Sequence, residues 1–152
     1  MNENTKKYWE DYWKDKEIPA NVVAEQFGNE QIADELAHLI VIGKKTATCS
    51  AHILYEMENS PLPEVGLYTI ILDSKEEPVA IIRTTEVQLI KMNEVSEELA
   101  ILEGEGDLTY KYWYDGHVKF FTEEFQEYNL QFTDNILLVF EHFELIDVKE
   151  KI

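Results

Sequence analysis

The chain has 152 residues, with 31 Asp or Glu against 13 Lys or Arg, so its formal net charge is -18 at pH 7. Such an acidic chain repels DNA and anionic lipid surfaces at long range, which argues against both as partners. A 45% hydrophobic fraction with 12% aromatic residues predicts a folded globule, and the single cysteine excludes an internal disulfide. No segment approaches the roughly 18 apolar residues of a membrane helix, and the first residues do not resemble a signal peptide. We therefore expect one cytoplasmic domain over residues 1–152.

The N-terminal segment places aromatic side chains at helical spacing. Four of them fall on one face of residues 6–16: Tyr8, Trp9, Tyr12 and Trp13. This pattern predicts a short amphipathic helix packed against the body of the protein. We assign residues 1–26 to a helical extension and residues 27–148 to a core of strands and helices.

The next predicted helix runs from Asn29, as its N-cap, to about Ile42. Its apolar stripe consists of Ile32, Leu36, Leu39 and Ile40. Gly43 is expected to end this helix, so Lys44 and Lys45 follow the negative end of its dipole. Residues 46–50 then read as a short extended piece, 51–58 as either helical or extended, and the PLPEVG segment as a loop.

The best strand patterns cover residues 67–73 and 78–90, joined by a turn. Polar residues at 83–86 interrupt the second strand and predict a bend, a bulge or the wall of a wet cleft. A helix is expected over 97–103, followed by the EGEGD turn.

Asp107 is expected to cap a long helix that ends near Tyr128 and carries an aromatic stripe. The last strand, 136–148, changes the parity of its apolar positions near Phe140, as a bulge or burial on both faces would require. Together these elements predict an α+β fold with a curled, barrel-like sheet flanked by helices.

Common signatures of chemistry are missing from the sequence. The four histidines are scattered, one cysteine cannot build a thiolate site, and no HExxH motif occurs, so no metal and no cofactor are expected. A phosphate-binding loop and a GxSxG nucleophile motif are also absent.

The GKKTAT segment carries the remaining candidates. Lys45 can anchor a carbonyl or phosphate oxygen, or act as a base if its pKa is lowered, and Thr48 can act as a nucleophile beside a base. In a regular strand the two residues would face opposite sides, so they converge only if Lys45 still lies in the turn after the helix. The alternative is a helix-capping lysine followed by an ordinary strand.

Other polar residues can be interpreted as having purely structural roles. Glu103 reads as a solvated helix end, His117 as a hydrogen-bonded core residue, and Cys49 as a small buried hydrophobic residue. Arg83 and Glu86 in the interrupted strand can face water or pair with each other.

Three segments together resemble the ASCH domain superfamily: FGNEQIADELAHLIVIGKKTATCS, PLPEVGLYTIILD and EGEGDLTYKYWYDGHVKFF. The chain looks closest to a bacterial branch of uncharacterised proteins with GKKTAT and EGEGD motifs. The resemblance implies a PUA-like fold, a small β-barrel flanked by helices. Members of this superfamily include proposed RNA-binding modules and a small amidohydrolase that removes the acetyl group from acetylcytidine.

Carried over from that amidohydrolase, the resemblance implies Lys45, Thr48 and Glu103 as catalytic residues. Thr48 would attack the amide carbonyl, Lys45 would act as its base, and Glu103 would assist proton transfer to the leaving amine. The ligand-binding positions expected around them are Lys44, Thr46, Ser50, Arg83, Trp113 and His117.

Electrostatics oppose one part of this scheme. Glu103 and the strongly negative protein both raise the pKa of Lys45, whereas a lysine base needs a lowered pKa. Unless burial outweighs both, Lys45 is better placed as an electrophilic anchor for a carbonyl oxygen.

Two classes of function therefore stay open: hydrolysis of an amide on a nucleoside-like small molecule, or non-catalytic binding of single-stranded RNA or a small ligand in the same cleft. RNA binding would require a basic strip that overcomes the net charge. Its candidate members are Lys44, Lys45, Arg83, Lys111 and Lys119.

Overall fold

Five strands of the described part of the chain form one open sheet in the order β1-β3-β4-β5-β2. The structure is a computed structural model, and it describes residues 1–149. The strands are β1 Val22–Glu25, β2 Ala47–Ala51, β3 Tyr68–Leu72, β4 Pro78–Lys91 and β5 Leu137–Val148. The β1–β3 pair is parallel, whereas the other three pairs are antiparallel.

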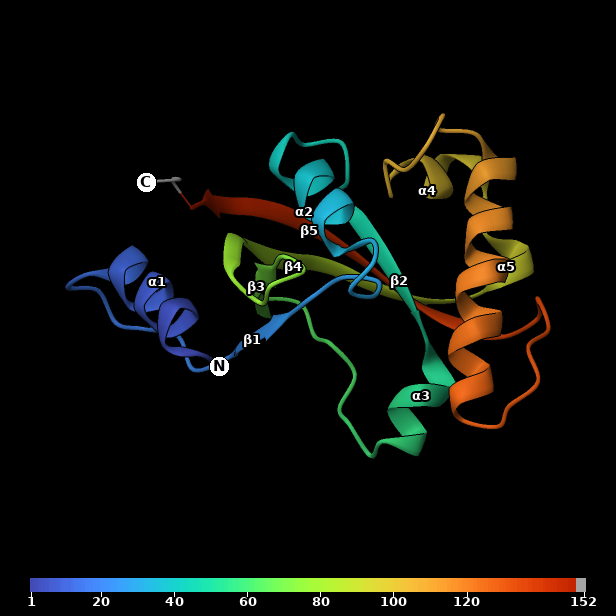
Figure 1. Ribbon diagram of the computed structural model, residues 1–152, viewed down its shortest axis with the longest axis horizontal. Helices are drawn as coiled ribbons and strands as arrows, with labels where there is room; N and C mark the ends of the chain where they lie inside the picture. Colours follow the sequence, from blue (N-terminus) through green and yellow to red (C-terminus); the bar gives the residue numbers. More distant parts are fainter. Residues whose placement is uncertain (150–152) are drawn as a thin grey trace.

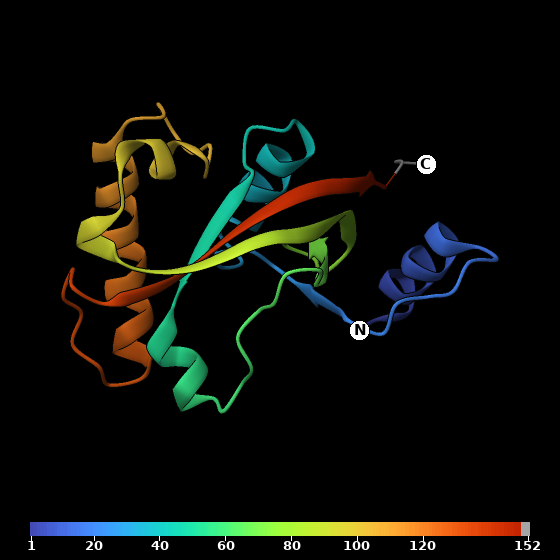
Figure 2. The ribbon, with the colours of Figure 1, turned by 180° about the vertical axis from the view of Figure 1, so that it is seen from behind.

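Within residues 1–149, five α-helices and one 3₁₀ turn surround this sheet. They are α1 Glu3–Trp13, α2 Ala33–Val41, α3 His52–Met57, the 3₁₀ turn Met92–Glu94, α4 Glu97–Ile101 and α5 Tyr110–Glu127. The long strands β4 and β5 connect the two ends of the molecule, with α1 at one end and α4 and α5 at the other (Figure 1). Helices α2 and α3 lie on opposite sides of these strands, as the view from behind also shows (Figure 2).

Three apolar clusters hold the helices on the sheet. Tyr8 and Trp9 of α1 pack near Ile70 and Ile81, while α2 packs on the neighbouring Ile71 and Ile82. Because successive residues of a strand face opposite sides, α1 and α2 cover opposite faces of the same pair of strands.

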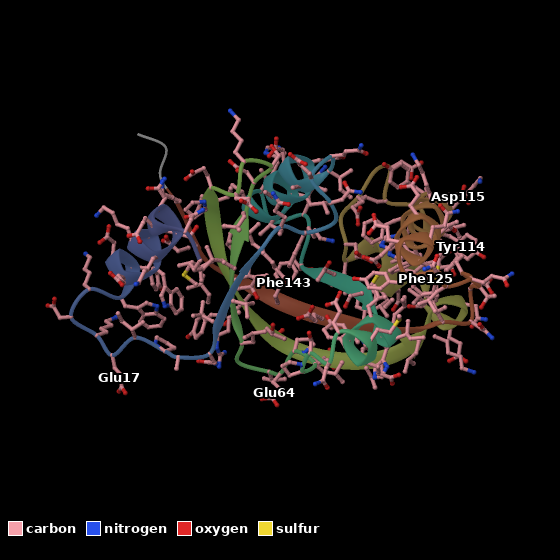
Figure 3. All side chains as sticks on the ribbon, turned by 60° about the horizontal axis from the view of Figure 1, so that its bottom comes forward. Glu17, Glu64, Tyr114, Asp115, Phe125 and Phe143 are labelled. Carbon is pink, nitrogen blue, oxygen red and sulfur yellow. The ribbon has the colours of Figure 1, made fainter. Side chains whose placement is uncertain are left out.

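The third cluster joins α5 to the other end of the sheet. It includes Trp113, Phe121 and Phe125 of α5 with Leu138 and Phe140 of β5. Phe125, in this cluster, and Phe143, in the α2 cluster, mark two separate parts of the core (Figure 3). The aromatic stripe of the sequence is therefore the face by which α5 attaches to the sheet.

The predicted α+β class is confirmed, and the architecture is consistent with a PUA-like fold. The polar interruption at residues 83–86, for which a bend, a bulge or the wall of a cleft was expected, coincides with a shift of the β4–β5 register between Thr84 and Glu86. Leu138, Val139 and Phe140 are three consecutive buried residues, so β5 is buried on both faces there, as the change of parity in the last strand indicated.

Three local predictions need correction. Residues 22–25 were assigned to the helical extension but form β1, a four-residue strand too short for a pattern of period two to stand out. Asn29 does not cap α2 directly; its side chain accepts hydrogen bonds from the amides of Gln31 and Ile32 in the turn before the helix. The N-cap of α5 is Thr109, and Asp107 instead accepts hydrogen bonds from the amide and hydroxyl of Thr109.

Within residues 1–149, no helix combines the length and the apolar character that crossing a bilayer requires.

Candidate active site

A tight turn after α2 directs Lys45 into the protein. Gly43 has φ +81°, a left-handed conformation that suits glycine, and it ends the helix as predicted. The amides of Lys44 and Lys45 then both donate to the carbonyl of Leu39, at 3.0 and 3.1 Å. Lys45 thus lies in the turn, before β2 begins at Ala47, and strand alternation does not fix its direction.

The turn that follows α4 lies directly on this lysine turn. The amides of Thr46 and Ala47 donate to the carbonyl of Leu102 at 2.8 and 3.1 Å. Gly104 has φ +69°, and a Cβ atom added there would lie 2.3 Å from the carbonyl oxygen of Lys44. Only glycine permits so close an approach, and the approach places Glu103 next to Lys45.

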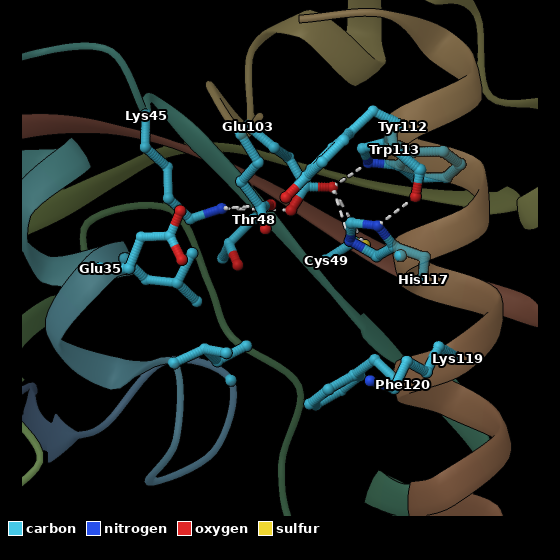
Figure 4. A pocket seen from close by; sticks show the side chains of 15 residues that line it. Glu35, Lys45, Thr48, Cys49, Glu103, Tyr112, Trp113, His117, Lys119 and Phe120 are labelled. Carbon is cyan, nitrogen blue, oxygen red and sulfur yellow. Dashed lines mark hydrogen bonds and ion pairs between the residues drawn. The ribbon is translucent and has the colours of Figure 1, made fainter. Parts of the chain in front are cut away.

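Glu103 is the centre of a buried polar network (Figure 4). Its Oε1 atom lies 3.1 Å from Nζ of Lys45, and its Oε2 atom lies 3.2 Å from Nε2 of His117. Oε2 also accepts hydrogen bonds from the indole N–H of Trp113 and, at 3.3 Å, from the thiol of Cys49. Lys45 and Glu103 are each 2% exposed, so this carboxylate and this ammonium are compensated by protein groups instead of water.

The ionisation of the network follows from its charges. Burial alone would raise the pKa of Glu103, but His117 and Lys45 outweigh it and hold the pKa well below the ordinary value. Burial lowers the pKa of Lys45 and of His117, yet the charge of Glu103 outweighs burial in both cases and the pKa of each is raised. The resting site therefore contains an ammonium, a carboxylate and a histidine biased toward its charged form.

Glu105 adds a second carboxyl group. Its Oε2 atom lies 3.5 Å from Nζ of Lys45, and its side chain is 22% exposed. Burial raises the pKa of Glu105, Lys45 lowers it and Glu103 raises it, with a net upward shift. Glu105 is thus the member of the pair that holds a proton more readily.

These groups line a cavity of about 280 Å³. Thr48, on β2, reaches the same cavity, and Figure 4 shows it beside the Lys45–Glu103 pair. The remaining wall comes from α2, the segment before it, and α5: Gly28, Ile32, Glu35, Leu36, Tyr112, Gly116, Lys119 and Phe120. A compact polar floor under partly aromatic walls is the usual composition of a small-molecule site.

Comparison with known proteins agrees with this architecture. The family model for the ASCH domain matches residues 23–147. This chain belongs to the ASCH domain family. The match spans nearly all of the sheet, so the strands and helices that position the cavity lie within the ASCH domain.

Two solved structures are similar over almost their full length. An ASCH domain from Lactobacillus crispatus JV V101 has 31% sequence identity and a TM-score of 0.90, with 97% of this chain and 96% of that chain covered. A protein from Enterococcus faecalis V583, of a domain family of unknown function, has 42% identity and a TM-score of 0.85, with 97% and 91% covered. The search of curated proteins finds no match.

Of the nine catalytic and ligand-binding residues expected from the sequence, five reach the cavity of this ASCH domain: Lys45, Thr48, Glu103, Trp113 and His117. The other four do not line it: Lys44, Thr46, Ser50 and Arg83. Ser50 shares a hydrogen bond of 2.8 Å with Tyr55, and Arg83 pairs with Glu144 at 3.6 Å. Ser50 lies two residues beyond Thr48 on β2, next to α3, and the partner of Arg83 is on β5, so both contacts are with residues outside the cavity lining.

Several wall residues of the cavity were not expected from the sequence. Tyr112 and Phe120 flank Trp113 and His117 on α5, and helical spacing from those two residues was the available signal. Cys49, interpreted as a small hydrophobic residue, is a donor to Glu103, and burial raises the pKa of its thiol. Glu105 had a weaker signal, as the second glutamate of EGEGD.

Cys49, Glu103 and His117 place one potential metal-ligand atom each within 4.8 Å of one another. The charges do not favour a cation there. Lys45 already neutralises Glu103 at 3.1 Å, and Oε2 of Glu103 accepts from Trp113. A divalent ion would face the ammonium across one carboxylate, so we interpret the cluster as an ion-pair network.

Proposed function

We propose that this ASCH domain binds a nucleoside-sized molecule in the cavity and hydrolyses an amide bond on it, as in acetylcytidine. The observation that carries the proposal is the buried Lys45–Glu103 pair, at 3.1 Å, on the floor of a cavity that Thr48 also lines. Buried and mutually compensated charges at the base of a cavity are typical of sites that stabilise charge during a reaction.

The size and walls of the cavity support a single nucleoside as the ligand class. Its volume of about 280 Å³ lies just below the roughly 300–1,000 Å³ of pockets that bury drug-sized ligands. Tyr112 is 46% exposed and Phe120 is half-buried, so their rings are available to a planar base. Stacking of a base on an aromatic ring contributes about 1–3 kcal/mol.

In the proposed reaction, Thr48 attacks the amide carbonyl and Lys45 binds the carbonyl oxygen. Lys45 acts as an anchor and not as the base, because its raised pKa keeps the ammonium charged. The negative charge that develops on the oxygen is then stabilised by a preorganised cation. Glu103 keeps that cation in place and orients His117 on the opposite side of the carboxylate.

Single-stranded RNA binding is less well supported by the charges. Of the five candidate cations of the basic strip, Lys45 pairs with Glu103, Arg83 with Glu144, and Lys111 with Asp115 at 2.5 Å. Lys44 and Lys119 are exposed and are the members without an ion pair among the described residues. Two lysines release few counterions, which gives weak RNA affinity at physiological salt.

The test is turnover of acetylcytidine and a panel of acylated nucleosides, followed by chromatography. Wild type is compared with Lys45→Met and Thr48→Ala, and with Thr85→Ala as a matched control, because Thr85 is exposed on β4 outside the cavity. Loss of turnover in the first two variants, with activity kept in the control, supports the proposal. Absence of turnover in folded wild type, together with tight and salt-sensitive binding of single-stranded RNA, contradicts it in favour of RNA binding.

We also propose that residues 1–152 act as a single ASCH domain with α1 as its N-terminal extension, and that it works in the cytoplasm. The single cysteine of the chain is compatible with a reducing compartment.

A further inference from the structure

We propose that Glu105 is the residue that exchanges protons with the substrate, and that Glu103 serves to position Lys45 and His117. The inference rests on the proposed function, because it assigns the missing base in the same cavity. The two glutamates are separated by one glycine in EGEGD and both contact Lys45, yet they differ in exposure and in the number of groups bonded to them.

Glu103 is poorly placed to exchange a proton. Its two oxygens already receive Lys45, His117, Trp113 and Cys49, and a carboxylate offers about four acceptor positions. The residue is 2% exposed, so protonation would leave two cations buried without their counter-charge. Its lowered pKa agrees with a carboxylate that stays ionised throughout.

Glu105 has the opposite character. Its side chain is 22% exposed, it lines the cavity, and its ionic contact among the described residues is Lys45 at 3.5 Å. The charged groups that face it are Lys45 from the turn after α2, Glu103 from its own turn and His117 from α5. Glu35 of α2 lines the same cavity. With its pKa shifted upward, Glu105 is closer than Glu103 to the range in which a carboxyl both takes and returns a proton.

The chemistry balances with Glu105 as the only proton carrier. As Oγ of Thr48 bonds to the amide carbon, its proton passes to the Glu105 carboxylate, and the negative carbonyl oxygen is held by Lys45. The carbonyl re-forms, the C–N bond breaks and Glu105 returns the proton to the leaving nitrogen, which releases the amine and leaves an ester on Thr48. Water then attacks the ester and gives its proton to Glu105, which passes it to Oγ of Thr48 as the carboxylic acid leaves.

The kinetic test uses Glu105→Gln, Glu105→Asp and Glu98→Gln with the best acylated nucleoside of the panel. Glu98 is an exposed residue of α4, so its variant makes the same charge change outside the cavity. We expect Glu105→Gln to lower kcat by about 100-fold or more, with little change in KM, and to abolish the acid limb of the pH–rate profile. The Asp variant should restore part of kcat. A Glu105→Gln protein within about threefold of wild type, with the acid limb kept, overturns the inference.

A substrate-independent test separates this inference from the proposed function. Carbon-13 NMR titration of the glutamate carboxyls compares Glu103 and Glu105 directly in wild type. We expect Glu105 to titrate above an ordinary glutamate and Glu103 below it. The reverse order overturns the assignment whether or not a substrate is found, whereas failed turnover with the expected order overturns only the proposed function.

Discussion

Gly104 is the residue whose substitution tests how the site is assembled. An alanine Cβ at this position would lie 2.3 Å from the carbonyl oxygen of Lys44, well inside the van der Waals distance of about 3.5 Å. The opposing atom belongs to backbone that is itself tied to Leu39, so it cannot move aside as a flexible side chain would. Gly43 is the matched control, because it has φ +81° in the facing turn and nothing within 4 Å of an added Cβ.

The magnitude follows from two separate costs. A left-handed conformation costs a non-glycine residue about 1–2 kcal/mol, and both variants incur this cost. The overlap adds about 1–3 kcal/mol in Gly104→Ala alone. We expect losses in the free energy of unfolding of about 1–2 kcal/mol for Gly43→Ala and about 2–5 kcal/mol for Gly104→Ala. At about 2–4 °C per kcal/mol, Tm should fall by about 2–8 °C and about 4–20 °C respectively.

Urea and thermal unfolding, followed by circular dichroism, measure both changes. A second readout is the pKa of His117 by NMR, which should fall toward its ordinary value in Gly104→Ala because Glu103 moves away. If the two alanine variants lose the same stability within about 0.5 kcal/mol, and His117 titrates as in wild type, the close approach does not assemble the site and the reasoning is wrong.

Three further substitutions test other parts of the structure. Gly116→Ala, in the interior of α5 with no atom within 4 Å of the added Cβ, should raise the free energy of unfolding by about 0.5–1 kcal/mol in urea denaturation; a loss would mean hidden crowding. Lys45→Met should lower the free energy of unfolding by about 3–5 kcal/mol at pH 7, because Glu103 keeps its charge without its nearest cation. A loss below about 1 kcal/mol would show that the ion pair is not desolvated. Glu141→Gln tests a group whose pKa is raised to about 7, first by burial and then by Glu25. A carboxyl with a raised pKa contributes stability that is present below its unfolded pKa and is lost as pH rises through about 7. The Gln variant should therefore match the stability of wild type at pH 4 and be more stable than wild type by up to about 3 kcal/mol at pH 8. Equal stability of the two proteins at both pH values would refute the raised pKa.

Local patterns in the sequence were sufficient for most of the elements. Sequence periodicity and residue propensity predicted α1 and α5 from their aromatic spacing, and β4 and β5 from their long apolar runs. The glycine after α2 marked the end of that helix. The resemblance of three segments to ASCH domains added the fold, and the family match agrees. Strand β1 lacked such a signal because four residues carry too little pattern, and its place in the sheet depends on the distant β3.

The candidate site, like the fold, could be predicted only in part from the sequence. The sequence by itself determined which side chains were candidates, since Lys45 and Thr48 stand in the GKKTAT segment and the resemblance to the ASCH superfamily adds Glu103. Only the tertiary structure decided which of them meet and in what state of charge. Residues 58 positions apart are joined because Gly104 lets one turn rest on another, and four donors around one buried carboxylate fix its ionisation. Burial and close approach depend on how distant segments pack, and a linear pattern contains no measure of either.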